Sequence, residues 1–150
     1  MAEANSQLDR LLVDWARARD GFAPERRDGH YVFVFDGEYE VELSQDGSRM
    51  LMRSELEMLP ADIRLANTLI ERVLSIHLGR SMAGEEIVTV EPEGKRLILF
   101  RELPVPESVT RFSEAIGAFV NAAAFWTRRL RAEIATETAP RGPQMRMMYP

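Results

Sequence analysis

Cysteine is absent from these 150 residues, and histidine occurs only twice, at His30 and His77. The absence of cysteine excludes disulfide bonds, zinc-thiolate sites and thiol nucleophiles. It is also typical of proteins in a reducing compartment, so the cytoplasm is the expected location. A signal peptide is not expected, because residues 1–7 lack a charged start followed by an apolar stretch.

Long apolar runs and an excess of positive charge are also missing. The most apolar stretch, residues 116–126, is interrupted by Asn121 and is shorter than the roughly 20 residues that a membrane span needs. Because 24 acidic residues outnumber 19 basic ones, the formal net charge is -5. Phosphate backbones and anionic membranes would be repelled by this charge. We therefore expect neither a nucleic acid nor a membrane as partner.

The sequence contains no recognisable catalytic or phosphate-binding motif. It has no G-x-S-x-G, no G-x-x-x-x-G-K-[ST] and no G-x-G-x-x-G. His77 falls on the apolar face of a predicted helix, which favours a core or interface histidine, and His30 is expected at the polar surface. The alternating Glu38, Glu40 and Glu42 could gather a divalent cation, but a solvated strand face is the favoured interpretation. We expect no catalytic, cofactor-binding or metal-binding residue, and no enzyme.

The residues that are present predict one folded domain. Hydrophobic residues make up 45% of the chain and charged residues 29%, which is typical of globular proteins. Apolar spacing predicts a first amphipathic helix between Ser6 and Arg19. The charged stretch 21–29 is expected to be a loop. From His30 the alternation has period two, and Asp-Gly pairs at 36–37 and 46–47 predict the turns of a three-stranded meander.

Further along the chain, a second helix is expected over residues 61–78, with Pro60 in its first turn and Gly79 just past its end. A hairpin over 86–90 and 96–102 follows, and Pro104 and Pro106 precede a third helix with one wide apolar stripe. The order α-β-β-β-α-β-β-α predicts an α+β fold with an antiparallel five-stranded sheet packed with three helices. Residues 1–136 are expected to form this domain, and 137–150 a flexible tail rich in Met and Pro.

The second helix carries two apolar stripes. The first gathers Ile63, Ala66, Ile70, Val73, Leu74 and His77, and the second gathers Leu65, Leu69 and Ile76. A helix on a sheet needs only one such stripe for the core. The other stripe must be covered either by another element of the same chain or by a second subunit.

The order of elements and three local patterns carry a resemblance to a known family. The patterns are D-G-H-Y-V-F-V-F-D-G at 28–37, E-L-E-M-L-P at 55–60 and F-x-x-x-I-x-x-F-V-x-x-A-x-x-W at 112–126. Together they resemble the class I type III secretion chaperones, the Tir chaperone family. The resemblance covers about residues 6 to 135.

This resemblance implies a homodimer in the bacterial cytoplasm that works without a cofactor. It would bind the N-terminal chaperone-binding segment of a secreted effector and keep that segment soluble and export-competent. In the family the first helix and early strands line the effector groove, which assigns effector binding to Leu8, Leu11, Leu12, Trp15, Val32 and Val34. The second helix and the following strand form the dimer contact, which assigns the interface to Leu65, Leu69, Ile76, Val88 and Val90.

Two other functions remain open from the sequence. A ligand-binding or regulatory α+β domain without a protein client would need a closed apolar pocket. A small-molecule enzyme would need a convergent set of polar groups, and the sequence supplies no motif for one. A chaperone instead needs apolar grooves on its outside.

Overall fold

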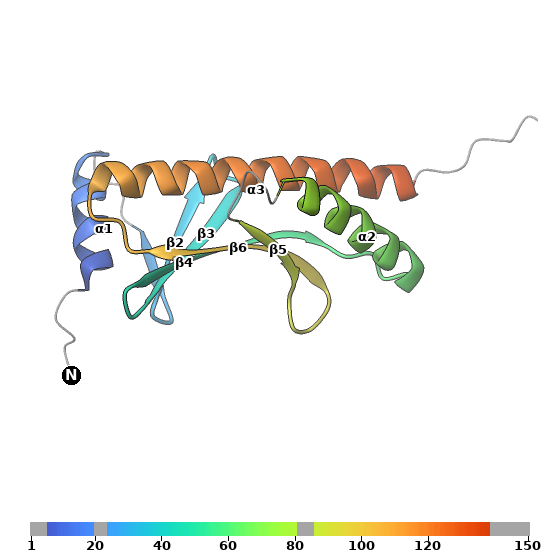
Figure 1. Ribbon diagram of the computed structural model, residues 1–150, viewed down its shortest axis with the longest axis horizontal. Coiled ribbons are helices and arrows are strands. Elements are labelled where there is room, and N and C mark those ends of the chain that lie inside the picture. The colour runs from blue at the N-terminus through green and yellow to red at the C-terminus, as the bar shows by residue number, and fades with distance from the viewer. Residues whose placement is uncertain (1–5, 20–23, 81–85, 139–150) are drawn as a thin grey trace, which may run out of the picture.

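The computed structural model describes residues 6–19, 24–80 and 86–138. One antiparallel sheet, in the order β1-β2-β3-β4-β6-β5, carries the helices α1, α2 and α3 (Figure 1). The helices are α1 Gln7–Arg17, α2 Ile63–Arg80 and α3 Val109–Thr138. The strands are β1 Glu25–Arg27, β2 His30–Phe35, β3 Tyr39–Asp46, β4 Arg49–Met58, β5 Ile87–Val90 and β6 Arg96–Pro104. The predicted α+β fold is confirmed.

The sheet has one strand more than predicted. Instead of a loop over the whole of 21–29, β1 pairs with β2, and the turn between them is made by Asp28 and Gly29 with φ of 49° and 80°. Both residue types tolerate this left-handed conformation. The strand was not predicted because its residues are charged and show no apolar alternation. In the structure Arg27 pairs with Glu25 at 3.1 Å and with Glu40 at 3.4 Å. Residues 20–23 lie outside the described part of the chain.

Side-chain caps decide where the helices begin. Ser6 accepts from the N–H of Asp9, and the Asp9 carboxylate accepts from the N–H of Ser6, which is a capping box for α1. The Asp62 carboxylate accepts from the N–H of Arg64 at 2.8 Å, so α2 starts after Pro60 rather than with it. The Ser108 hydroxyl accepts from the N–H of Arg111 at 3.2 Å at the start of α3.

The far ends of the helices also differ from the prediction. Gly79 lies inside α2, which continues to Arg80, because this glycine keeps helical geometry instead of ending the helix. The predicted domain boundary at 136 falls inside the last turn of α3. The rest of the predicted tail, residues 139–150, lies outside the described residues.

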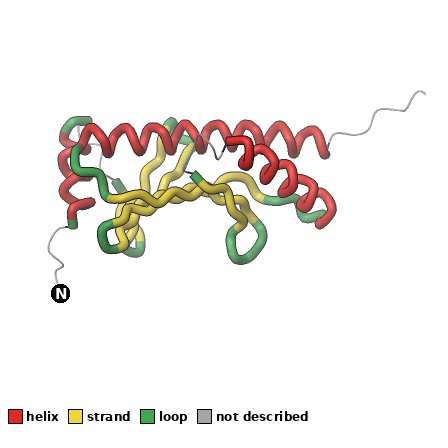
Figure 2. Tube along the Cα trace, in the orientation of Figure 1, coloured by secondary structure: helices red, strands yellow, loops and turns green. Residues whose placement is uncertain are grey.

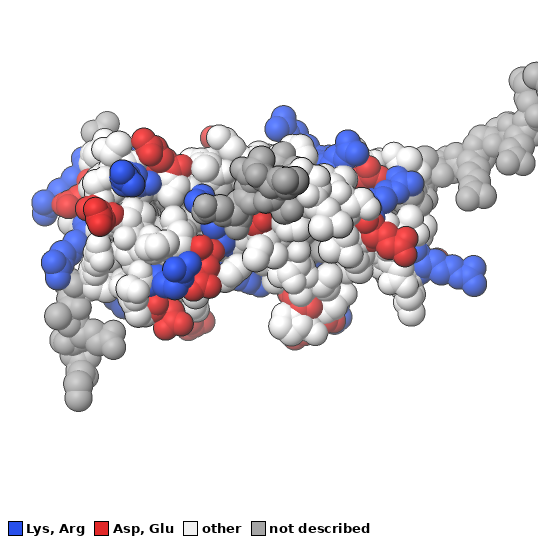
Figure 3. Space-filling model, viewed as in Figure 1, with Lys and Arg blue, Asp and Glu red and all other residues white. Residues whose placement is uncertain are grey.

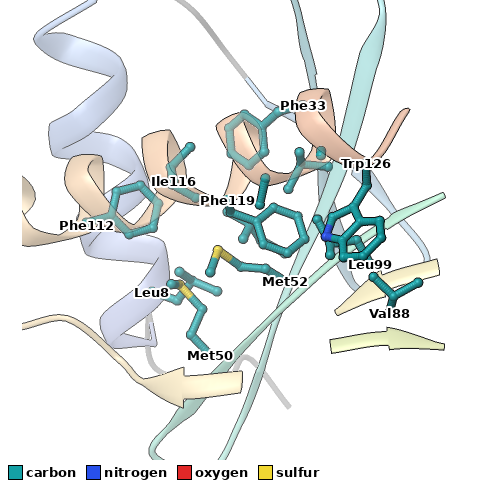
Figure 4. Close-up of a cluster of buried hydrophobic side chains, with 14 of the residues drawn as sticks. Leu8, Phe33, Met50, Met52, Val88, Leu99, Phe112, Ile116, Phe119 and Trp126 are labelled. Carbon is teal, nitrogen blue, oxygen red and sulfur yellow. The ribbon is translucent and has the colours of Figure 1, made fainter. Parts of the chain in front are cut away.

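The core lies between the sheet and α3, which spans the sheet from α1 at one end to α2 at the other (Figures 1 and 2). The predicted stripe of α3 supplies Phe112, Ile116, Phe119 and Trp126, all of which are buried. They meet buried side chains of the strands, including Phe33, Met50, Met52, Val88 and Leu99 (Figure 4). Phe125, for which periodicity offered no role, is half-buried with its ring 5.4 Å from that of Trp126.

The two stripes of α2 are assigned differently from the prediction. Leu69, which was expected at a dimer contact, is 1% exposed and belongs to the core, whereas Ile63 and Leu74 are 75% and 50% exposed. The stripe that was left for the core therefore includes two exposed residues, and the stripe that was assigned to the dimer contact includes a core residue. The physical reason is that α2 packs against α3 and β5 at the end of the sheet, so the face it buries depends on where those elements lie. Within the described residues, no helix is both long enough and apolar enough to cross a membrane.

Candidate functional site

The acidic face of β3 is neutralised by arginines. Glu40 pairs with Arg27 at 3.4 Å, and Glu42 pairs with Arg53 at 3.4 Å. Among residues 6–19, 24–80 and 86–138, no group of three or more His, Asp and Glu side chains is placed to hold a metal ion. The strand face is thus an ion-pair surface.

Arg131 of α3 ties the helix to two parts of the sheet. Its guanidinium lies 2.7 Å from the Glu57 carboxylate and 2.8 Å from that of Glu38. The hydrogen bond to Glu57, followed by the one to Glu38, raises the pKa of Arg131 above its ordinary value. An open hollow of about 220 Å³ beside this network is lined mainly by charged side chains, namely Glu38, Glu40, Glu42, Arg53, Glu55, Leu56 and Arg96. It is poorly suited to an apolar ligand.

The two histidines occupy different environments. His30 is exposed at the start of β2, as expected of a polar surface residue. His77 is half-buried, and its ring centroid lies 6.1 Å from that of Trp126. This contact fits a histidine that packs at the junction of α2 and α3.

The predicted effector-binding residues of α1 are directed into the protein's own core. The buried side chains are Leu8, Leu11, Leu12 and Trp15. The Trp15 ring makes edge-to-face contacts with Phe33 at 5.4 Å and with Phe112 at 5.7 Å. In this arrangement none of the four offers surface to a partner, because β2 and α3 already cover them.

Hydrogen bonds fasten α1 in this position. The Tyr31 hydroxyl of β2 donates to the Asp9 carboxylate. The N–H of Leu8 donates to the Gln45 side-chain oxygen at 3.2 Å, and the Gln7 amide donates to the Pro106 carbonyl at 3.3 Å. The first turn of α1 is therefore joined to β2, β3 and the segment before α3.

The remaining two predicted effector contacts lie on the face of β2 that points away from α3. Val32 is buried there, whereas Val34 is about half exposed. They stand opposite Glu42 and Glu40 of β3, so charged side chains border both valines. Of the six predicted effector contacts, Val34 offers the most surface in this conformation.

The predicted dimer residues are mostly turned inward. Leu69 and Val88 are buried, while Leu65, Ile76 and Val90 are half-buried. The exposed apolar side chains of α2 are instead Ile63, Leu74 and Leu78, which we call the α2 patch. At about 100° per residue these three fall on one side of the helix together with the half-buried Ile70. Their spacing was present in the sequence, where Leu78 was overlooked.

A groove of about 550 Å³ runs between the end of β6 and the first half of α3. We call it the β6–α3 groove, and its lining comprises Arg101, Leu103, Pro104, Val105, Pro106, Glu107, Arg111, Glu114, Ala115 and Ala118. Figure 3 shows acidic and basic side chains interspersed on this face of the molecule. Sequence reasoning missed the groove, and the available signal was small alanines on one side of an otherwise bulky helix.

Comparison with known proteins gives one family and one fold. The model of the Tir chaperone protein (CesT) family matches residues 21–127, and no curated protein matches the chain. This family match confirms the resemblance seen in the sequence.

Solved structures with the same fold include chains from chaperone complexes. A chain in the HopA1-SchA chaperone-effector complex is 18% identical, with a TM-score of 0.64 over 81% of this chain and 93% of that one. A chain in the ExsC-ExsE complex is 16% identical, with a TM-score of 0.65 over 85% and 96%. A chain in the heterodimeric ExoU-SpcU complex of the Pseudomonas aeruginosa type III secretion system is 18% identical, with a TM-score of 0.59 over 85% and 97%. At these identities the likeness is one of fold.

Proposed function

Because the chain belongs to the Tir chaperone protein (CesT) family, we propose that it is a type III secretion chaperone acting in the bacterial cytoplasm. It binds the N-terminal chaperone-binding segment of a secreted effector and keeps that segment soluble and export-competent. The observation that carries the proposal is the family match, which extends from the start of the sheet region to the middle of α3. The fold shared with chains of the HopA1-SchA and ExoU-SpcU complexes supports it.

The surface of the chain also favours a protein client over a small ligand. The two hollows described above are open, and one of them is lined largely by charges. A small-ligand site is usually a cleft that buries most of its ligand. An extended peptide needs only a shallow groove and a strand edge. This supports the chaperone over the ligand-binding or regulatory domain, and the proposal assigns no catalysed reaction and no cofactor.

We further propose that the homodimer forms through the α2 patch. Ile63, Leu74 and Leu78 are at least half exposed on one side of α2. Around a two-fold axis, this side can pack against the same side of α2 in a second copy. Ile87 of the neighbouring strand β5 is 52% exposed and extends the apolar surface. We place the half-buried Leu65, Ile76 and Val90 at the edge of this contact. Leu69 and Val88 are buried in the core and support the contact from beneath.

Co-expression tests the proposed function directly. The tagged chain is produced with N-terminal segments of secreted proteins from a type III system, with internal segments of the same proteins as matched controls. We expect an N-terminal segment to co-purify, and light scattering to give two copies of the chain with one segment. Retention of neither kind of segment by the folded chain would contradict the chaperone assignment.

A further inference from the structure

His77 lies between the core and the α2 patch. Its ring centroid is 6.1 Å from that of Trp126, which is fully buried. At about 100° per residue, His77 falls within about 20° of Ile70, two turns earlier on the patch side of α2. Leu74 precedes it by three residues, so these two side chains are neighbours on the helix surface. The half-buried imidazole therefore meets Trp126 on one side and borders the α2 patch on the other.

Contacts between α2 and α3 hold His77 at this boundary. Arg72 pairs with Glu133 at 2.5 Å, and five residues further along α2 His77 meets Trp126, which lies seven residues earlier in α3. The two helices therefore run in opposite directions where they meet, and Figure 1 shows α2 approaching the middle of α3. Sliding α2 along α3 would break both contacts, so the imidazole stays beside the patch.

The charged groups around His77 are already engaged elsewhere or lie to one side. Glu133 of α3 pairs with Arg72 at 2.5 Å and with Arg129 at 3.4 Å. Glu71 of α2 is exposed and lies about 120° round the helix from His77. Strand β5, which also packs against α2, has no titratable side chain. Among the side chains that the structure describes, no carboxylate is ion-paired with His77, so a proton there would add an unpaired charge.

A second copy on the α2 patch would cover this imidazole further. Where antiparallel α2 helices meet about a two-fold axis, residues equally far from the middle of the patch lie opposite each other. His77 of one copy therefore comes to lie against the apolar Ile63 end of the other patch. Covering an unpaired charge costs far more than covering a neutral ring. The contact with Trp126 lies within one chain, so it is common to monomer and dimer and leaves this difference unchanged.

We propose that the dimer contact is sensitive to protons and that His77 is the residue that senses them. This inference rests on the proposed homodimer and adds a regulation to it. Histidine is the side chain that ordinarily gains a proton between about pH 8 and pH 5. Because cover by the second copy disfavours the charged form of His77, the dimer binds fewer protons than two separate chains. By linkage the dimer weakens as the pH falls through this range and strengthens as it rises.

The net charge of the chain works in the opposite direction. With a formal net charge of -5, two copies repel each other at neutral pH. Lowering the pH reduces this negative charge and, by itself, favours association. A dimer that weakens in mild acid therefore points to a specific group at the contact rather than to overall repulsion.

The dissociation constant of the dimer, measured at about pH 7.5 and about pH 5.5, tests the proposal. Sedimentation over a dilution series of the full chain measures it. We expect the parent dimer to be about tenfold or more weaker at the lower pH, since each copy contributes one His77. In His77→Gln, whose side chain is polar but gains no proton, the two values should agree within about twofold. His77→Leu, a second uncharged variant, should behave in the same way.

Two control variants keep His77 and remove other titratable groups. His30→Gln changes the other histidine of the chain, which is exposed at the start of β2. Glu71→Gln removes the exposed carboxylate of α2 that lies nearest the patch in sequence. Both should retain the full pH dependence of the parent. Far-ultraviolet circular dichroism at both pH values verifies that each variant is folded.

The outcomes separate this inference from the proposed function. A pH dependence that is present in the parent and both controls but lost in His77→Gln and His77→Leu supports it. A parent dimer of equal strength at the two pH values, or a pH dependence that survives in both His77 variants, overturns it. Folded His77 variants that are monomeric at both pH values also overturn it, because His77 would then serve the contact itself. A monomeric parent that still retains an N-terminal client segment overturns the α2 contact and this inference, but not the chaperone function.

Discussion

The two short helices have similar apolar spacing but opposite relations to solvent. Leu12 of α1 is 3% exposed. Three hydrogen bonds fasten the first turn of this helix: Tyr31 donates to Asp9, the N–H of Leu8 donates to Gln45, and Gln7 donates to the Pro106 carbonyl. Leu74 of α2 is 50% exposed on a side that carries Ile63 and Leu78 as well. The comparison teaches that an amphipathic pattern predicts a face to be covered, but not whether the cover comes from the same chain.

The largest effect should follow from a charge on the buried side of α1. Leu12→Asp should lower the free energy of unfolding by roughly 3 to 5 kcal/mol, because an unpaired carboxylate enters the core. Urea denaturation measures this. The matched control is Val13→Asp, which is 50% exposed and should change stability by about 0.5 kcal/mol or less. A stable Leu12→Asp variant that loses only client binding would return α1 to the client site.

A cavity on the buried side of α2 should have the next largest effect. Leu69→Ala should cost about 3 kcal/mol of unfolding free energy, because Leu69 is 1% exposed within the core. Leu78→Ala, at 70% exposure, should cost far less in a monomer held at low concentration. Thermal unfolding of both variants checks this, and equal losses would contradict the assignment of the two sides.

A charge on the exposed side of α2 should act on association rather than on folding. Leu74→Glu should weaken the dimer by about 2 kcal/mol, because the charge would be desolvated at a two-fold contact. Light scattering over a dilution series should then give the mass of one chain where the parent gives that of two. Val13→Glu is the control, because Val13 and Leu74 are equally exposed at 50%. A Leu74→Glu variant that remains dimeric would remove the α2 patch from the interface.

The smallest effect should follow from the bond that fastens α1. Tyr31→Phe removes the hydroxyl that donates to Asp9 and should cost about 1 kcal/mol. Native-state hydrogen exchange should show faster exchange in α1 and little change in α2. A uniform loss of protection over the whole chain would mean that α1 does not open separately.

The order of elements was predictable because each local signal had a physical cause within the sequence. The Asp36-Gly37 turn is an example, since both residues adopt positive φ at 53° and 66° and the N–H of Glu38 donates to the Phe35 carbonyl at 3.0 Å. The apolar stripe of α3 is another, because its members cover one side of a helix at the expected spacing. β1 escaped prediction because three charged, exposed residues carry no apolar alternation.

The candidate site was less predictable because its residues are defined by distant partners. Trp15 is buried by Phe112, which lies far along the chain, and no local pattern indicates that contact. The groove is lined by the end of β6, the segment after it and the first half of α3, and no local pattern indicates how these elements pack together. Periodicity identifies a residue's side of a helix or strand, whereas the occupant of that side depends on tertiary packing.

The length of α3 sets a distance. From Ala118, at the β6–α3 groove, to Glu133, which pairs with α2, the helix advances 15 residues, or about 22 Å at 1.5 Å per residue. About four turns of one helix therefore connect the groove with the contact to α2, and both Ala118 and Glu133 lie on the same side of it.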